Sequence, residues 1–182
     1  MLGFGKLPES RLNGLPSMNP YWIKKEGLRL GIIPRPRGQD WLADDIDALR
    51  HAGVDVVVSA LTAAETEEWG LLNESRCCED NGLKFLSFPI EDRSVPASVS
   101  EFDELLDSVT EYLRGGKAVV VHCWGGVGRS SVIAACALIR YGLSVDDAFH
   151  LIEESRGRQV PDTAEQRRWV EGYSSRCGSV GK

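Results

Sequence analysis

The run His-Cys-Trp-Gly-Gly-Val-Gly-Arg-Ser, at residues 122–130, has the residue types and the spacing that phosphate chemistry needs. Its three glycines let the backbone curl, because glycine takes a positive φ freely and lets a ligand approach the main chain closely. Backbone N–H groups of such a loop, followed by the start of a helix, can bind the oxygens of a phosphate monoester without lysines. The sequence therefore predicts a phosphate-binding loop that consists of Trp124, Gly125, Gly126, Val127 and Gly128.

Cys123 and Arg129 flank this loop and are predicted to act on the bound phosphate. Arg129 stands where the helix is expected to begin, and a planar guanidinium group can bind two phosphate oxygens at once. Cys123 would lie close to the N–H donors and to the positive end of the helix dipole, which both favour a thiolate. The thiolate is the nucleophilic form of cysteine. The alternative interpretations are a buried structural cysteine and an ordinary surface arginine.

The spacing of the glycines argues against a nucleotide-binding site, and the spacing of the cysteines against a metal site or a disulfide framework. The glycine loop lacks the Gly-x-x-x-x-Gly-Lys pattern of a nucleotide-binding P-loop. The cysteines are odd in number and lack the spacing of paired metal ligands or of a disulfide framework. We therefore expect no metal, no cofactor and free thiols at Cys77, Cys78, Cys123, Cys136 and Cys177.

Length and charge narrow the class of protein further. A chain of 182 residues is long enough for one compact domain with a substantial core. The net charge of −6 argues against sequence-independent binding to nucleic acid, which needs a basic surface. The longest apolar run, residues 132–139, is too short to span a membrane, and the first residues lack the apolar core of a secretory signal. We therefore expect a soluble, cytoplasmic protein with neither a membrane nor a nucleic acid as partner.

Hydrophobic periodicity and capping residues divide the chain into alternating strands and helices. Short apolar runs predict strands at residues 27–33, 54–60, 83–90 and 117–121. Amphipathic stretches predict helices at residues 40–51, 62–79, 98–113, 129–141, 144–156 and 162–173. Thr62 with Glu65 and Ser98 with Glu101 have capping-box spacing, and Ser144 is the expected cap of the fifth helix. Gly70 is a weak point in the second of these helices, and Asp162 is the expected cap of the last. This order predicts an α/β fold, a single domain with a central, mainly parallel sheet flanked by helices.

The ends of the chain are expected to differ from this domain. Residues 1–26 carry turn-forming residues and predict an irregular N-terminal arm, residues 27–176 the catalytic domain, and residues 177–182 a frayed tail. Open parallel sheets bind ligands beyond the carboxyl ends of their strands. The loops that start at Glu91 and at Cys123 both follow predicted strands, so we expect both loops at the site.

Three segments together resemble a known family. The run from His122 to Ser130 resembles the signature of cysteine-based protein phosphatases, His-Cys-x-x-x-x-x-Arg followed by Ser or Thr. The segment Phe-Pro-Ile-Glu-Asp, residues 88–92, resembles the general-acid loop of the dual-specificity branch, and residues 160–168 resemble a downstream segment of that superfamily. The arrangement over residues 28–173 is most similar to the kinase-associated-phosphatase type of dual-specificity phosphatase.

The resemblance implies a fold, an activity and a set of roles. Cys123 would attack the phosphorus, Asp92 would protonate the leaving oxygen, and Arg129 with the loop amides would hold the developing charge. Ser130 would donate a hydrogen bond to the departing thiolate in the second step. The substrate would be a phosphorylated protein, with phosphotyrosine first and phosphoserine or phosphothreonine next, and no metal would take part. Glu91 is the alternative carboxylate by composition alone.

Several further side chains have both a functional and a structural interpretation. His122 is a candidate support for the loop or a core histidine, and Gln166 a candidate for orienting water or an ordinary surface glutamine. A basic rim for phosphorylated substrates could consist of Arg35, Arg37 and Arg93, although scattered surface arginines are common.

Cysteines and tryptophans elsewhere in the chain favour structural interpretations. Cys77 and Cys78 could supply a resolving thiol for an oxidised Cys123, but a structural role is preferred. Core packing is the predicted role of the three tryptophans in helical patterns, Trp41, Trp69 and Trp169.

Two other functions compete with a phosphatase. A catalytically silent phosphate-binding module would keep the loop but lose a reacting group, whereas Cys123, Arg129 and Ser130 are all present with a candidate acid. A thiol redox enzyme, such as an arsenate reductase or a sulfur transferase, would need further reactive cysteines. Cys136, however, lies on an apolar stretch that looks buried. An active protein phosphatase is therefore the preferred interpretation.

Overall fold

A five-stranded sheet in the order β1-β2-β5-β3-β4 forms the centre of the protein, whose computed structural model describes residues 18–178. Its strands are β1 (Tyr21–Trp22), β2 (Leu30–Ile33), β3 (Val56–Ser59), β4 (Lys84–Ser87) and β5 (Val119–His122). The last four run parallel, and β1 pairs antiparallel with β2 at one edge. The predicted α/β fold with a mainly parallel sheet is confirmed.

Helices connect the strands and follow the last of them. They are α1 (Leu42–His51), preceded by the 3-10 turn η2 (Gln39–Trp41), α2 (Ala63–Glu68), α3 (Glu74–Asp80), α4 (Val99–Arg114), α5 (Arg129–Arg140), α6 (Val145–Arg156) and α7 (Ala164–Gly178). Three of the predicted caps are present, because the side chains of Thr62, Ser98 and Ser144 accept hydrogen bonds from backbone N–H groups in the first helical turn.

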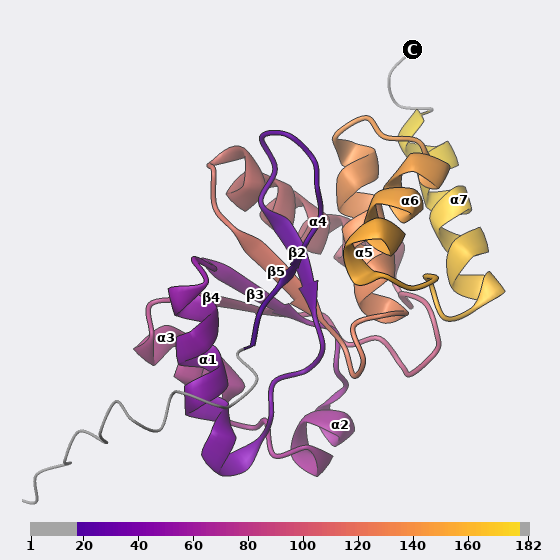
Figure 1. Ribbon diagram of the computed structural model, residues 1–182. Coiled ribbons are helices and arrows are strands. Elements are labelled where there is room, and N and C mark those ends of the chain that lie inside the picture. The colour runs from indigo at the N-terminus through magenta and orange to yellow at the C-terminus, as the bar shows by residue number, and fades with distance from the viewer. Residues whose placement is uncertain (1–17, 179–182) are drawn as a thin grey trace, which may run out of the picture.

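Side chains of the parallel strands alternate between two hydrophobic layers. In β3, Val56 and Val58 pack with α4, α5, α6 and α7, whereas Val57 packs with α1 and α3. The same alternation holds in β5, where Val120 faces the second layer. Figure 1 shows the two groups of helices on opposite sides of the sheet. Strands covered on both faces read as continuous apolar runs, which is why these runs were recognisable in the sequence.

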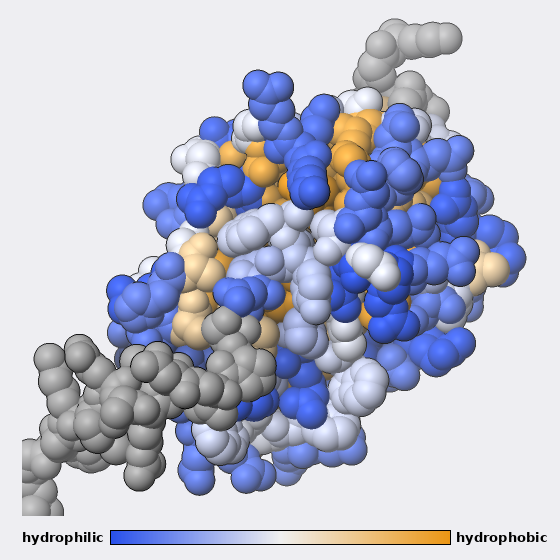
Figure 2. Space-filling model, viewed as in Figure 1, coloured by the Kyte–Doolittle hydropathy of each residue, from blue (hydrophilic) through white to orange (hydrophobic). Residues whose placement is uncertain are grey.

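The face of the protein seen in Figure 2 is mostly hydrophilic. In Figure 2, hydrophobic residues are visible only in small areas between polar side chains. No helix within residues 18–178 is long and apolar enough to cross a membrane.

The predicted helix at residues 62–79 is wrong in its middle part. It is divided into α2 and α3, and the chain between them turns at Gly70, whose φ is +68°. Such a left-handed conformation is available to glycine at little cost, so the helix is interrupted at the weak point that the sequence predicted. The last helix also begins one residue late, because Thr163 rather than Asp162 accepts a hydrogen bond, from the N–H of Gln166.

The predicted core role of Trp41 is wrong as well. Its side chain is 46% exposed, because Trp41 closes the turn η2 before α1 begins and its ring lies under the guanidinium group of Arg37. Trp69 and Trp169 are partly buried and pack against the two cores.

The ends of the chain also differ from prediction. Residues 18–26 are not irregular throughout, since Tyr21–Trp22 form β1 and the ring of Trp22 covers Gly31 of β2. A Cβ atom at Gly31 would lie 2.9 Å from that ring, so the close pairing requires glycine there. Helix α7 extends to Gly178, which shortens the predicted tail, and residues 1–17 and 179–182 lie outside the described residues.

Phe102 of α4 is the centre of an aromatic cluster that joins α4, α7 and the end of β4. Its ring is fully buried and meets the rings of Phe88, Trp169 and Tyr173 edge to face. We predict that Phe102→Ala lowers the free energy of unfolding by about 3–5 kcal/mol, because a large cavity replaces these contacts. Urea denaturation followed by circular dichroism measures this change. Leu72→Ala, at a side chain that is 69% exposed, is the control and should change it by less than about 0.5 kcal/mol.

Candidate active site

The carboxyl ends of the four parallel strands meet at one edge of the sheet. Ile33 and Ser59 are both in register with His122, the last residue of the central strand β5. The segments that follow β2, β3, β4 and β5 therefore start side by side. Each of the four contributes to the site, as expected for an open parallel sheet.

The segment after β5, residues 123–128, is held with several of its carbonyl groups turned towards the protein. Arg156, in the last turn of α6, donates hydrogen bonds to the carbonyls of Gly126 and Gly125, at 2.7 and 3.1 Å. The N–H of Arg35 donates to the carbonyl of Trp124 at 3.1 Å. Carbonyl groups engaged in this way are kept away from an anion, whose oxygens they would repel.

Gly126 is required by this arrangement. Its φ is +66°, and a Cβ atom there would lie 2.6 Å from the carbonyl oxygen of Ile33. The loop thus packs directly on the end of β2. Helix α5 starts immediately after the loop, and its N-cap, Gly128, has no side chain to satisfy the first N–H groups. Those donors are available to an anion.

Cys123 and Ser130 lie at the base of this loop. Both side chains are buried, and the Sγ atom of Cys123 is 3.5 Å from the Oγ atom of Ser130. The cysteine also borders the cavity in front of the loop, so a ligand can reach its sulfur.

Arg129, the first residue of α5, has a guanidinium group that is only 1% exposed. Its Nη1 and Nη2 atoms donate to the two carboxylate oxygens of Glu65 at 2.7 and 2.8 Å. Nη1 also donates to the carbonyl of Ile90 at 2.9 Å, and Nη2 lies 3.2 Å from Oδ1 of Asp92. The planar group thus binds Glu65 through both Nη atoms, and Nη2 also faces Asp92 beside the cavity.

Charge and burial oppose each other in the Arg129–Glu65 pair. Burial alone would lower the pKa of Arg129, but the hydrogen bonds with Glu65 and the nearby Cys123 and Asp92 raise it. Burial alone would raise the pKa of Glu65, but hydrogen bonds from Arg129 and Thr62 hold it below the usual 4.5. Both side chains are therefore ionised at neutral pH.

Two carboxylates and three arginines surround a cavity of about 230 Å³ in front of Cys123. Asp92 follows β4, and its exposed side chain lies on the cavity wall, whereas Glu91 does not line it. The turn that carries Asp92 is closed by a hydrogen bond from the N–H of Ser94 to the carbonyl of Glu91, with Arg93 at a φ of +58°. Asp162, which precedes α7, is the second carboxylate on the wall.

The predicted basic rim is only partly present. Arg93 lines the cavity together with Arg129 and Arg158, a residue that sequence reasoning missed. Arg35 and Arg37 border a separate cavity beside Trp41 and Trp69, and Arg37 is bound to Asp45 through two guanidinium nitrogens.

His122, next to the nucleophile candidate, is fully buried and faces another buried carboxylate. Its Nε2 atom is 2.9 Å from Oε1 of Glu74 in α3, although the contact is not aligned as a hydrogen bond. Its Nδ1 atom is 3.3 Å from the carbonyl of Cys123. Glu74 was not a candidate in the sequence, because a glutamate inside the helix predicted over residues 62–79 is ordinary on a solvent-facing side.

Gln166 is fully buried, so the interpretation as a surface glutamine is wrong. Its Oε1 accepts from the N–H of Thr163, and its Nε2 donates to the carbonyl of Ser94. A Cβ atom at Gly128 would lie 3.0 Å from this amide, so Gln166 lies between the loop and the segment that carries Asp92.

The other cysteines are poor partners for a redox reaction at Cys123. Burial, together with the charge of Glu74, raises the pKa of the Cys78 thiol to about 12. Burial also raises the pKa of Cys77 and, more strongly, that of Cys136. These three thiols are held in the protonated form, which favours the structural interpretation over that of resolving thiols.

Glu65 and Arg156 are two further contributors that sequence reasoning missed. Glu65 was identified only as the partner of Thr62 in a capping box, which is present. The contact of Glu65 with Arg129 joins residues 64 positions apart, and that of Arg156 with Gly126 joins residues 30 positions apart. An arginine in the last turn of a helix matches the helix dipole by itself, so local sequence gave no reason to look further.

The family model described as "Polymorphic toxin system, DSP-PTPase phosphatase" matches residues 32–143. The chain is 23% identical over 137 residues to cyclin-dependent kinase inhibitor 3 of Homo sapiens, covering 74% of this chain and 64% of that protein. It therefore spans less than two thirds of the length of that relative. It is 30% identical over 146 residues to protein tyrosine phosphatase PRL-1 of Leishmania major, covering 75% of this chain and 77% of that protein.

Solved structures share the fold. Kinase associated phosphatase (KAP), with a serine in place of its catalytic-site cysteine, superposes with a TM-score of 0.73 at 20% identity, covering 82% of this chain and 88% of that one. Tk-PTP in the active form superposes with a TM-score of 0.72 at 27% identity, covering 87% of this chain and 97% of that one.

The Glu65–Arg129 pair predicts a dependence of stability on pH. Because the pKa of Glu65 is lower in the folded protein, its contribution is fully present above pH 4.5 and is lost as the pH falls through the folded value. Glu65→Gln should lower the free energy of unfolding at pH 7 by about 3 kcal/mol, since it leaves Arg129 buried without its main counter-charge. Glutamine can still serve in the capping box, which isolates the charge effect.

Urea denaturation between pH 3 and pH 7 checks this prediction. The variant should lose less stability than the wild type as the pH falls below 4.5. Glu67→Gln, at an exposed position of the same helix, is the matched control. Equal losses at pH 7 in the two variants would contradict the prediction.

Proposed function

Because this chain belongs to the DSP-PTPase phosphatase family, we propose that it hydrolyses phosphotyrosine in proteins through a phosphocysteine intermediate. Phosphoserine and phosphothreonine are further candidate substrates. The observation that carries the proposal is the cavity in which Cys123, Arg129 and Asp92 meet at the start of α5, where no side chain caps the first N–H groups.

In the first step the Cys123 thiolate attacks the phosphorus opposite the leaving oxygen. The S–P bond forms as the bond from phosphorus to the tyrosine oxygen breaks, and Asp92 gives its proton to that oxygen. Arg129 and the N–H groups of residues 124–129 hold the charge that spreads over the phosphoryl oxygens. These donors are fixed before the substrate arrives, so no reorganisation is needed in the transition state.

In the second step a water molecule attacks the phosphocysteine. Asp92, now a carboxylate, takes a proton from this water, the S–P bond breaks, and the thiolate of Cys123 is restored. The hydroxyl of Ser130, 3.5 Å from the sulfur, can donate a hydrogen bond to the returning charge. His122 and Gln166 are positioning residues in this proposal, because each contacts the main chain beside the loop rather than the cavity.

A phosphorylated protein is the proposed substrate and partner. The residues between Cys123 and Arg129 are uncharged, so the loop offers no lysine for the further phosphates of a phosphoinositide. The cavity is open and bordered by Arg93 and Arg158, which suits a phosphorylated side chain on a peptide with acidic neighbours.

Hydrolysis of a generic aryl phosphate tests the proposal. The wild type and Cys123→Ser are compared in the presence of a chelator and a reducing agent, from acidic to neutral pH. We expect turnover by the wild type and none by the variant. An inactive wild type that binds a phosphotyrosine peptide would favour a silent binding module, and activity of Cys123→Ser would overturn the proposed nucleophile.

The two carboxylates of the cavity wall are distinguished by matched variants. We predict that Asp92→Asn lowers kcat for a phosphotyrosine peptide by about 10²–10⁴-fold, because the leaving oxygen loses its proton donor. Asp162→Asn should stay close to the wild type. Steady-state kinetics measure both, and the opposite order would assign the acid to Asp162.

A further inference from the structure

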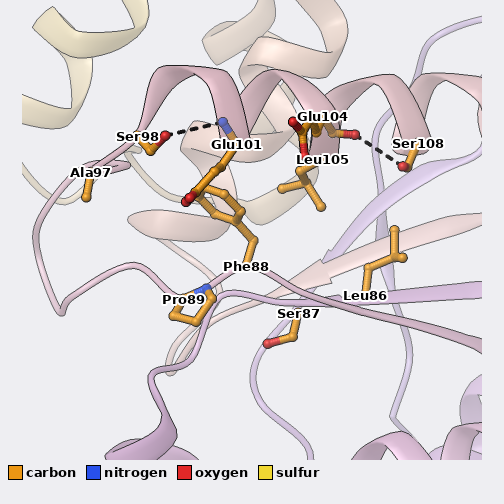
Figure 3. Close-up of a pocket in the computed structure, with 10 residues that line it drawn as sticks. All are labelled: Leu86, Ser87, Phe88, Pro89, Ala97, Ser98, Glu101, Glu104, Leu105 and Ser108. Carbon is orange, nitrogen blue, oxygen red and sulfur yellow. Dashed lines mark hydrogen bonds between the residues drawn. The ribbon is translucent and has the colours of Figure 1, made fainter.

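A groove of about 540 Å³ lies between strand β4 and helix α4, outside the cavity at Cys123. Leu86, Phe88 and Leu105 form its apolar floor, as Figure 3 shows. Glu101 and Glu104 project from the same side of α4 along its rim. None of these residues has a part in the proposed reaction.

β4 is the edge strand of the sheet on this side, and within residues 18–178 no strand pairs with its outer edge. The N–H groups of Lys84 and Phe88 donate to carbonyls of residues 55 and 59, next to and at the end of β3. Since a parallel strand bonds to one neighbour through every second residue, the main-chain groups of Phe85 and Ser87 face away from β3. Such groups are a template for a further strand.

The rim of the groove carries negative charge without a counter-charge. Glu101 and Glu104 are exposed and take part in no ion pair within the described part of the chain. In contrast, Asp103 and Asp107, on the same helix, are both bound to Arg140. The two glutamates are therefore free to pair with cations from another molecule.

We propose that the groove binds an extended, basic segment of a partner protein, which adds to the outer edge of β4 as a further strand. Alternate side chains of such a strand would point towards α4. A lysine or arginine there can lay its aliphatic stem on the apolar floor and bring its charge to the rim. Glu101 and Glu104 are about 4.5 Å apart along the helix axis, and alternate residues of a strand are about 6.7 Å apart, so long side chains at positions i and i+2 can reach both.

The groove lies next to the segment that leads to Asp92 in the candidate active site. Phe88 and Pro89 line the groove, and the next residue, Ile90, accepts the hydrogen bond from Arg129. A bound strand would thus be anchored at the segment that leads to Asp92. Binding itself requires no catalysis, so it is measured independently of the proposed activity.

Fluorescence anisotropy with labelled peptides tests the proposal. The probe is Lys-Thr-Arg-Thr-Lys-Thr, and a peptide of the same composition with its three basic residues adjacent is the control for spacing. We expect the wild type to bind the alternating peptide more tightly. The double variant E101Q/E104Q should weaken this binding about fivefold, as two exposed ion pairs are lost. E79Q/E154Q removes the same charge from exposed positions outside the groove and should leave the affinity within about twofold of the wild type.

A second variant tests the strand pairing itself. Ser87→Pro removes an N–H that faces away from β3, and proline is tolerated on edge strands. Circular dichroism should show a folded protein, and binding of the alternating peptide should be lost.

Three outcomes would overturn the proposal. Equal binding of the two peptides, or equal effects of the two double variants, would mean attraction to the net negative charge alone. Unchanged binding by Ser87→Pro would exclude strand addition. Failure of the peptide to bind a wild type that sedimentation shows to be dimeric, with the dimer lost in Ser87→Pro, would make a second copy of this chain the occupant.

Discussion

The buried guanidinium group of Arg129 is the constraint on which the rest of the site depends. A charge taken out of water is costly unless it is paired and hydrogen-bonded. Arg129 meets this condition through Glu65 on α2, the carbonyl of Ile90 and the carboxylate of Asp92. The segments that follow β3 and β4 are thereby bound to the first residue of α5. The position of the proposed acid relative to the proposed nucleophile is thus a consequence of satisfying one cation.

The parallel sheet brings the partners of Arg129 close to it, and hydrogen bonds from other segments hold the loop at residues 123–128. Parallel strands in register bring four chain segments to one edge, so partners distant in sequence start close together. A loop whose N–H groups face an anion must turn its carbonyl groups away from that anion. Here the side chain of Arg156 and the backbone N–H of Arg35 donate hydrogen bonds to these carbonyl groups. Helix α6 and the segment after β2 therefore support the proposed phosphate-binding loop from outside the cavity.

What the sequence could reveal was limited to interactions that are local or periodic. The strands and most helices follow from apolar runs and caps, and the cysteine loop from nine consecutive residues. Glu65 illustrates what was missed, because its capping-box role explained its presence completely, while its contact with Arg129 depends on how the fold brings together residues 64 positions apart. Trp41 shows the converse. A helical apolar pattern included it, but the helix begins one residue later, so its ring lies outside the core. The contact of Glu74 with His122 depends on the tertiary fold and has no local signal in the sequence.

The contact between Asp92 and Arg129 has a consequence for the proposed reaction. Asp92 lies 3.2 Å from Nη2, and Glu65 binds both Nη1 and Nη2, so a phosphate that approaches Arg129 from the cavity competes with Asp92 for the guanidinium group. In the proposed reaction, the substrate phosphate would therefore take the place of Asp92 beside Arg129. Binding of the substrate in this proposed reaction thus frees Asp92 to approach the leaving oxygen, while Glu65 keeps Arg129 ionised and in place.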